Sequence, residues 1–208
     1  MPRTAPQRHA VCRYAAIVPI VLFAGKPSMS PAVSPTVAAT AYGSHFANAG
    51  AACLAIEQAL PTITHAMRDP QVCGSGFLFI VVMDPGILPG ECRFEDAILV
   101  EHAIGDRTQW DADYAAFARA KAAVCWRHGQ DGQRLQYGLA HKLREGDSLL
   151  CGAVCLDGIT VGVSGAEAWW DEAFATSIAA NLRAIARGAH AQALKDRNAV
   201  AGVPAGAR

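Results

Sequence analysis

The tetrapeptide Gly162-Val163-Ser164-Gly165 has a composition that could bind an anion. Where such a turn leads from a strand into a helix, its backbone N–H groups and the positive end of the helix dipole can hold a carboxylate. The spacing of Ser164 and Glu167 is also that of a capping box, in which the serine only completes the helix. The stretch lacks the last glycine of the Gly-x-Ser-x-Gly nucleophile elbow, so we do not expect a serine nucleophile.

Two basic side chains could bind the same kind of group. Lys121 is expected on the apolar side of a helix, where it must extend to solvent, pair with an acid such as Asp171, or face a ligand. Arg107, in a Gly-Asp-Arg-Thr loop, could hold a carboxylate through two parallel hydrogen bonds or could simply be exposed. No group of residues forms a self-sufficient catalytic site. The candidate ligand-binding residues are therefore Arg107, Lys121, Gly162, Ser164, Gly165 and Asp171.

Three helices are expected to position these residues. Apolar residues at helical spacing predict a first helix within residues 44–69, with a kink or break near Leu60 caused by Pro61. A second helix is predicted to begin at Asp111 and to stop at Gly129. The last helix is predicted from four apolar residues that share one helical face, Phe174, Ile178, Leu182 and Ile185. It is predicted to end at Gly188, followed by a frayed tail over residues 191–208.

Four strands are expected between these helices. Residues 77–83 form a continuous apolar run that ends in Asp-Pro-Gly, and residues 97–104 form a second run. Two short apolar runs within residues 149–165 surround Asp157-Gly158, which is typical of a tight antiparallel hairpin. The fold class predicted is α/β in the α+β sense, with helices covering a mainly antiparallel sheet.

Composition limits the classes of function. The chain has 208 residues, of which 52% are hydrophobic and 17% charged, with no net charge. It lacks the basic surface that nucleic-acid binding requires, so nucleic acid is not an expected partner. With so little charge to keep copies apart, we expect a homo-oligomer. Trp169 and Trp170 cannot both face one core, and one of them is expected to meet a partner subunit or a ligand.

The amino-terminal region has two interpretations. Residues 1–43 are either a disordered extension or a signal-like segment, and their apolar run is too short to span a bilayer. Seven cysteines without CxxC spacing indicate free thiols rather than a disulfide framework or a metal site. We therefore expect one domain over residues 44–190, located in the cytoplasm or, if the first segment is a signal, exported.

The sequence resembles the GlcG/HbpS-like family, whose members are often described as haem-binding or haem-degrading. The resemblance covers roughly residues 50–188. It lies in a strand that ends in an Asp-x-x-Gly-like turn, a central Lys-Ala in a helix, a Gly-rich hairpin closed by Gly-x-Ser-Gly, and a helix that opens with Asp-Glu. The residues that carry it are Val82–Gly86, Ala120-Lys121-Ala122, Gly152–Gly165 and Asp171-Glu172.

This resemblance implies a profilin-like α-β-α sandwich, oligomeric assembly and non-covalent binding of haem or another tetrapyrrole. Haem iron most often takes a histidine as axial ligand, and His65 and His102 are the candidates nearest to apolar surface. The function expected is a homo-oligomeric binding protein for a tetrapyrrole or a small anionic ligand. A haem-degrading enzyme and an accessory protein without ligand chemistry are the alternatives.

Overall fold

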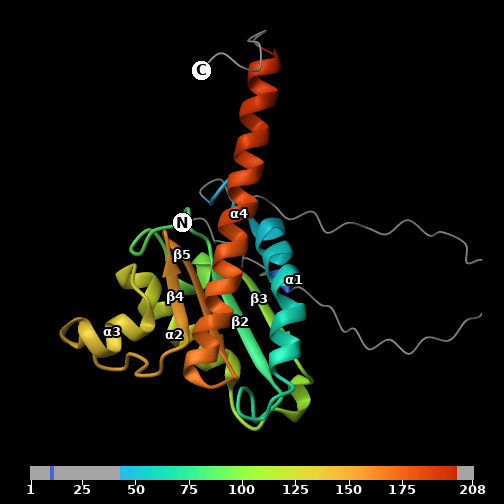
Figure 1. The fold of residues 1–208 in the computed structure, drawn as a ribbon. Coiled ribbons are helices and arrows are strands. Elements are labelled where there is room, and N and C mark those ends of the chain that lie inside the picture. Colours follow the sequence, from blue (N-terminus) through green and yellow to red (C-terminus); the bar gives the residue numbers. More distant parts are fainter. Residues whose placement is uncertain (1–9, 12–42, 201–208) are drawn as a thin grey trace, which may run out of the picture.

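The structure is a computed structural model that describes residues 10–11 and 43–200 (Figure 1). The extension or signal predicted for residues 1–43 therefore lies almost wholly outside the described residues, as do residues 201–208 of the predicted tail.

A five-stranded sheet in the order β1-β3-β2-β5-β4 forms the centre of the molecule. The four longer strands pair antiparallel, and the two-residue strand β1 pairs parallel to β3 at one edge. This mainly antiparallel arrangement confirms the predicted fold class. The strands are β1 (Ala10–Val11), β2 (Leu78–Met83), β3 (Ile98–Ile104), β4 (Ala153–Leu156) and β5 (Ile159–Ser164).

Helices cover both faces of the sheet. On one face, α1 (Ala49–Ala66) and α4 (Ala168–Val200) pack against each other (Figure 1). On the other face, α2 (Tyr114–His128) packs on β2 and β5, and the short α3 (Gly132–Gly138) follows it. Three 3₁₀ turns, Phe94–Ala97, Arg107–Gln109 and Ala140–Lys142, complete the elements. The result is the expected α-β-α sandwich.

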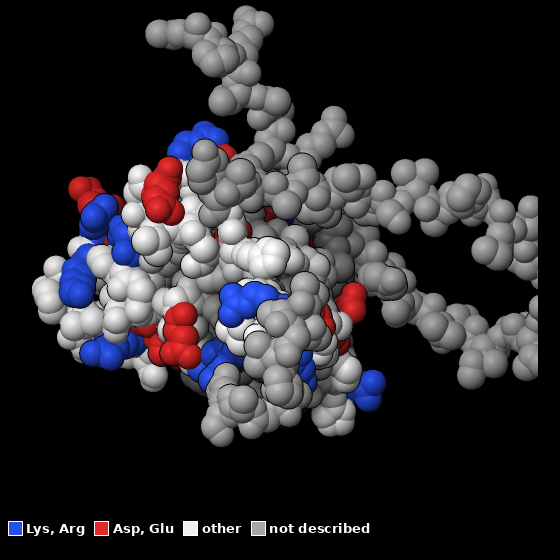
Figure 2. Space-filling view, turned by 90° about the horizontal axis from the view of Figure 1, so that it is seen from above, with Lys and Arg blue, Asp and Glu red and all other residues white. Residues whose placement is uncertain are grey.

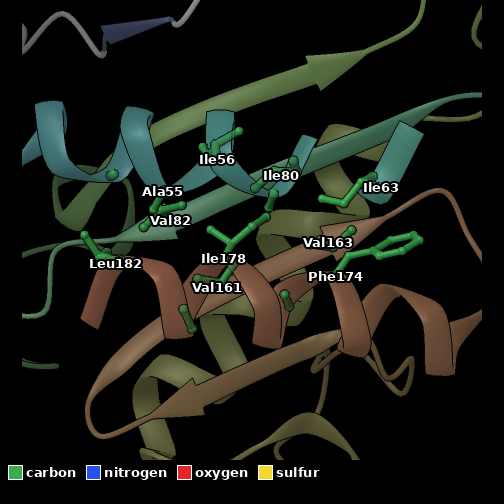
Figure 3. Packing of buried hydrophobic residues seen from close by; sticks show 14 of the residues in the cluster. Ala55, Ile56, Ile63, Ile80, Val82, Val161, Val163, Phe174, Ile178 and Leu182 are labelled. Atoms are coloured by element: carbon green, nitrogen blue, oxygen red, sulfur yellow. The ribbon is translucent and has the colours of Figure 1, made fainter. Parts of the chain in front are cut away.

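The strand β2 shows why the central run of the sequence is apolar throughout. Ile80 and Val82 belong to the core cluster shared with α1 and α4, whereas Phe79 and Val81 belong to the cluster under α2. A strand covered on both faces needs apolar residues at every position. Figure 3 shows the first of these cores, in which Ile178 and other side chains of α4 meet β2, β5 and α1. Burying a side chain of this size contributes about 1.5–3 kcal/mol.

The hairpin predicted around Asp157-Gly158 is confirmed. β4 and β5 pair antiparallel, and the two turn residues have φ angles of 51° and 86°. Both turn positions of a type I′ turn require positive φ, which explains this residue pair. β4 begins at Ala153 rather than near residue 149, so it is a short edge strand. The carboxylate of Asp131 accepts a hydrogen bond from the backbone N–H of Cys155 on this strand (2.8 Å), which occupies a donor of the edge.

Two helix predictions are wrong in their details. Of the kink or break predicted in α1 near Leu60, the break is absent, because α1 continues through Pro61 with the buried residues Ala59 and Ile63 on either side of it. The helix α4 continues past Gly188 to Val200, so the fraying predicted to begin at residue 191 does not occur in the described part of the tail. A glycine lowers helix stability by about 1 kcal/mol but does not end a helix unless the backbone turns there.

The boundaries of α2 match the prediction at one end only. Gly129 adopts the left-handed conformation (φ 60°) and ends the helix, as predicted. At the other end Asp113, not Asp111, is the cap, since its carboxylate accepts from the N–H of Ala116. Asp111 instead accepts from the Tyr114 hydroxyl. The helix α3 was not predicted, because its seven residues contain little apolar periodicity.

Candidate functional site

The buried ammonium group of Lys121 lies between the two helical layers. It extends from α2 and donates to the Asp171 carboxylate on α4 (2.8 Å), the Ser164 hydroxyl (3.2 Å) and the Val163 carbonyl (3.1 Å). Lys121 is only 5% exposed and Asp171 only 1%. The predicted alternative that Lys121 pairs with an acid is therefore confirmed. Breaking a buried pair of this kind by removing one partner typically costs 3–5 kcal/mol, because the other charge is left without compensation.

Gly152 makes room for this ion pair. It has a φ of 125°, and a Cβ placed on it would lie 2.8 Å from both the Lys121 ammonium nitrogen and the Asp171 Cβ. Its carbonyl still accepts from the Val163 N–H (2.8 Å). The ion pair therefore joins α2 to α4 beside the end of the β4–β5 ladder, where Gly152 has no side chain to collide with it.

The carboxylate of Asp171 occupies the anion position that the turn was predicted to offer. The N–H of Ala166 donates to it (3.0 Å), and Gly165 contributes a second backbone N–H. Burial raises the pKa of Asp171 to about 6, although Lys121 and these N–H groups act in the opposite direction. The arrangement is an internal anion site filled by the chain's own side chain.

The remaining residues of the turn serve packing. A Cβ on Gly162 would lie 2.6 Å from the Ala118 carbonyl, so this glycine lets α2 approach β5 closely. The carbonyl of Gly165 accepts from Cys73 and Ser75 (both 3.3 Å). The predicted capping box is absent, because the N–H of Glu167 donates to the Val72 carbonyl and α4 begins at Ala168.

Arg107 lies on a second group of residues, which we call the aromatic platform and define as Phe77, Phe79, Trp110 and Tyr114. Its guanidinium carbon is 4.9 Å from the centroid of the Trp110 ring and 5.5 Å from that of Phe79. The residue is exposed, and it has no ion-pair partner within the described part of the chain. Its donors are therefore open to solvent while its carbon is held over two rings.

The rings of the platform are held in position by contacts with one another. Trp110 meets Phe79 and Tyr114 edge to face, with centroid distances of 5.7 and 5.5 Å. The Tyr114 hydroxyl donates to Asp111 (2.6 Å), and burial raises the pKa of Tyr114. Edge-to-face pairs of this kind add about 0.5–1.5 kcal/mol each beyond their buried area. The surface under Arg107 is thus a fixed apolar one.

The platform and the buried ion pair are neighbours on the sheet. Phe79 pairs with Ser164 on β5 and with Ala103 on β3, and its side chain lies on the face that α2 covers. Ser164 is the residue to which Lys121 donates. The two groups are therefore linked through the row of residues that crosses the sheet at Phe79. The structure brings Lys121, Ser164 and Asp171 into direct contact and places Arg107 with the platform instead.

The two histidines do not share a site. His65 is exposed on α1, two residues beyond the buried Ile63. His102 is 4% exposed in β3 and pairs with Ile80, whose side chain belongs to the core under α1 and α4. A haem iron could reach His102 only by displacing packed side chains, and His65 faces solvent. The residues present do not fit haem ligated in the interior of the subunit.

Among the described residues, no three or more His, Cys, Asp or Glu side chains are arranged to hold a metal ion. The described cysteines are free thiols, and burial raises the pKa of Cys125. Within the same residues, none of the helices combines the length and hydrophobicity needed to cross a bilayer.

Sequence analysis missed the platform and the residues that complete it. Arg119 and Glu101 form a bidentate ion pair beside Phe79. A signal was available, since Glu101 is the one acid in a strand that is apolar apart from it and His102, and a buried acid would need a cation. The aromatic residues are dispersed over residues 77–114, so only the fold brings them together.

Comparison with known proteins gave one solved structure. No protein-family model matches the chain, and no curated protein matches it. The solved structure is described as the crystal structure of a PduOC:heme complex, and it aligns with a TM-score of 0.38 and 17% identity, covering 62% of this chain and 91% of that chain.

Proposed function

We propose that this chain is a homo-oligomeric binding protein for a small flat ligand that carries a carboxylate. Haem and other tetrapyrroles, which carry propionate groups, belong to this class and are the candidates that the family resemblance implies. The ligand would lie at the surface, with a carboxylate on Arg107 and its apolar body against the half-buried members of the platform, Phe77, Trp110 and Tyr114.

The observation that carries this proposal is the state of Arg107. A guanidinium stacked on aromatic rings keeps its N–H fork directed outward, which is the geometry for two parallel hydrogen bonds to a carboxylate. Because the contacts with Trp110 and Phe79 already hold the side chain, little conformational freedom is lost on binding. Exposed Phe117, one turn along α2 from Tyr114, adds apolar surface at this end of the helix.

The same observations favour binding over catalysis. Lys121 and Asp171, which are the most deeply buried ionisable pair described, are committed to each other and to the backbone. Neither can take or give a proton to a ligand at the surface without leaving its partner. We therefore assign these two residues, with Gly162, Ser164 and Gly165, the role of holding the sheet beneath Phe79 in place.

Titration of the full chain with haemin and with metal-free protoporphyrin tests the proposal. Both carry propionates on a flat ring, and both can be followed by the change in their Soret band. We expect saturable binding of both, and a loss of affinity of about tenfold or more in R107M, since charge-assisted hydrogen bonds are removed. R107K, which keeps the charge without the fork, should fall between.

R134M removes an exposed arginine on α3 and is the matched control, for which wild-type affinity is expected. Binding that is equal in wild type and R107M would refute the site, and the absence of any saturable change with both probes would refute the function. A Soret band that appears with haemin only and disappears in H65A would instead indicate an iron-ligated haem site on α1.

A further inference from the structure

Two guanidinium groups border the same ring of the platform. The guanidinium carbon of Arg107 lies 5.5 Å from the centroid of Phe79, and that of Arg119 lies 5.8 Å from it. Two cations so close to one buried ring would attract a ligand with two carboxylates. The number of carboxylates that the site can pair therefore depends on whether one or both of these arginines are available to a ligand.

Arg119 is already occupied. Its Nε and Nη2 donate to the two oxygens of Glu101, at 2.6 and 2.8 Å. Glu101 pairs with Val81 in the sheet and lies on the face that α2 covers, and its side chain is 10% exposed. The guanidinium keeps a second pair of donors on Nη1 and Nη2, but the charge of Glu101 compensates its positive charge and weakens its attraction for a second carboxylate.

We infer that Glu101 determines the charge selectivity of the ligand site, because by neutralising Arg119 it leaves Arg107 as the guanidinium whose positive charge has no ion-pair partner within the described residues. The site would then prefer a ligand that presents one carboxylate at this point over a ligand that presents two. Glu101 is on this view a specificity-determining residue that does not touch the ligand. The inference rests on the proposed function, since it assumes that ligands bind at Arg107.

The charges of the two arginines and Glu101 support this assignment. These three groups together carry one positive charge. The carboxylates of Asp113 and Glu95 also act on Arg119, but they are the same in every variant considered below. Replacing Glu101 by glutamine would raise the charge of the three groups to two and remove one of the two acceptors of Arg119. Replacing Arg119 by methionine would lower it to zero and leave Glu101 to repel an incoming anion. The two substitutions therefore have opposite expected effects.

Calorimetric titration of the full chain with benzoate and with isophthalate tests the inference. Both are flat, and they differ by one carboxylate. In wild type we expect isophthalate to bind no more tightly than benzoate. In E101Q we expect isophthalate to gain about tenfold over benzoate, the size of one added charge-assisted interaction.

R119M provides an independent measurement if E101Q folds poorly. It should weaken benzoate binding several-fold although Arg119 itself does not bind the ligand, and the double variant E101Q/R119M should restore wild-type benzoate affinity. A merely structural role for the pair would make the double variant the weakest of the three. Circular dichroism of each variant identifies loss of folding.

The outcomes separate this inference from the proposed function. If benzoate binding is lost in R107M but E101Q leaves the ratio of the two affinities unchanged, the site stands and the role of Glu101 is refuted. If neither benzoate nor isophthalate binds to wild type or to E101Q in a way that depends on Arg107, both the site and this inference are refuted.

Discussion

Asp171 is a buried acid whose surroundings make the stability of the protein depend on pH. Its carboxylate accepts from Lys121 and from backbone N–H groups, yet burial still raises its pKa to about 6 from a usual 3.8. In the folded chain it therefore holds its proton to a higher pH than in the unfolded chain. Between these two values the folded state binds more protons, so the free energy of unfolding must fall as the pH rises.

The predicted consequence is a pH dependence that D171N removes. From pH 4 to pH 6, the free energy of unfolding of wild type relative to D171N should fall by about 2–3 kcal/mol, since each unit of pKa difference is worth about 1.4 kcal/mol. Urea unfolding at a series of pH values measures this difference. E57Q makes the same carboxyl-to-amide change on the exposed face of α1 and is the control. A difference between wild type and D171N that is constant over this range, or that grows with pH, would contradict the assignment.

The absence of a side chain at Gly152 leaves the space that the ion pair occupies. A Cβ at this position would collide with Lys121 and Asp171, so the ion pair and the glycine depend on each other. The motif residues Lys121, Gly152 and Asp171 are thus explained by one structural unit that joins α2 to α4. Their presence in the sequence does not require a ligand.

Among the elements, α4 differs most from what the sequence indicated. Phe174, Ile178 and Leu182 are buried as predicted, but the helix has 33 residues and runs well beyond the last of them. At 1.5 Å per residue it is about 50 Å long. Its carboxyl-terminal part projects from the body of the molecule, and residues 187–193 are exposed (Figure 1).

Replacement of Gly188 by alanine distinguishes a helix that continues from one that ends there. Gly188 is helical with nothing within 4 Å of an added Cβ, so G188A should stabilise this part of α4 by about 0.5–1 kcal/mol. Amide hydrogen exchange of residues 186–192 measures the change. Gly129 has a φ of 60° at the true end of α2, and G129A should destabilise that helix end. Faster exchange in G188A would show that the helix stops at this glycine.

At the scale of the whole molecule, the surface offers little charge to prevent self-association. The chain has no net charge, and acidic and basic side chains lie among each other on the face shown in Figure 2. Trp170 packs beside Phe174 with a ring distance of 5.8 Å, whereas Trp169 is 66% exposed. The pair thus faces different surroundings, as the sequence predicted, and Trp169 is the residue available to a partner subunit.

We predict that Trp169 is an anchor of the proposed contact between subunits. If the chain assembles as proposed, W169E places a charge at that contact and should convert the assembly to a smaller species, because an exposed tryptophan of this kind often carries a large share of binding energy. Sedimentation velocity at several concentrations measures the mass. L54E adds the same charge at a 42% exposed leucine on α1 and should leave the mass unchanged. A monomeric wild type, or equal masses for both variants and wild type, would refute the prediction.

The sequence alone determined the features that depend on neighbours along the chain. A continuous apolar run predicted β2, and a run that is apolar except for Glu101 and His102 predicted β3. Asp157-Gly158 specified its hairpin because both residues must take positive φ. The helical spacing of Phe174, Ile178 and Leu182 placed α4 on the sheet. These inferences need only the local geometry of strands, turns and helices, which is why they hold.

Only the tertiary structure decided where the charges and rings meet. The sequence left open whether Lys121 faced an acid or a ligand, and the fold resolved this by bringing Asp171 to it from fifty residues away. The platform under Arg107 and the neutralisation of Arg119 by Glu101 likewise join segments that periodicity cannot relate. Burial and electrostatic pairing depend on distances through space, and a single sequence contains no direct measure of those distances.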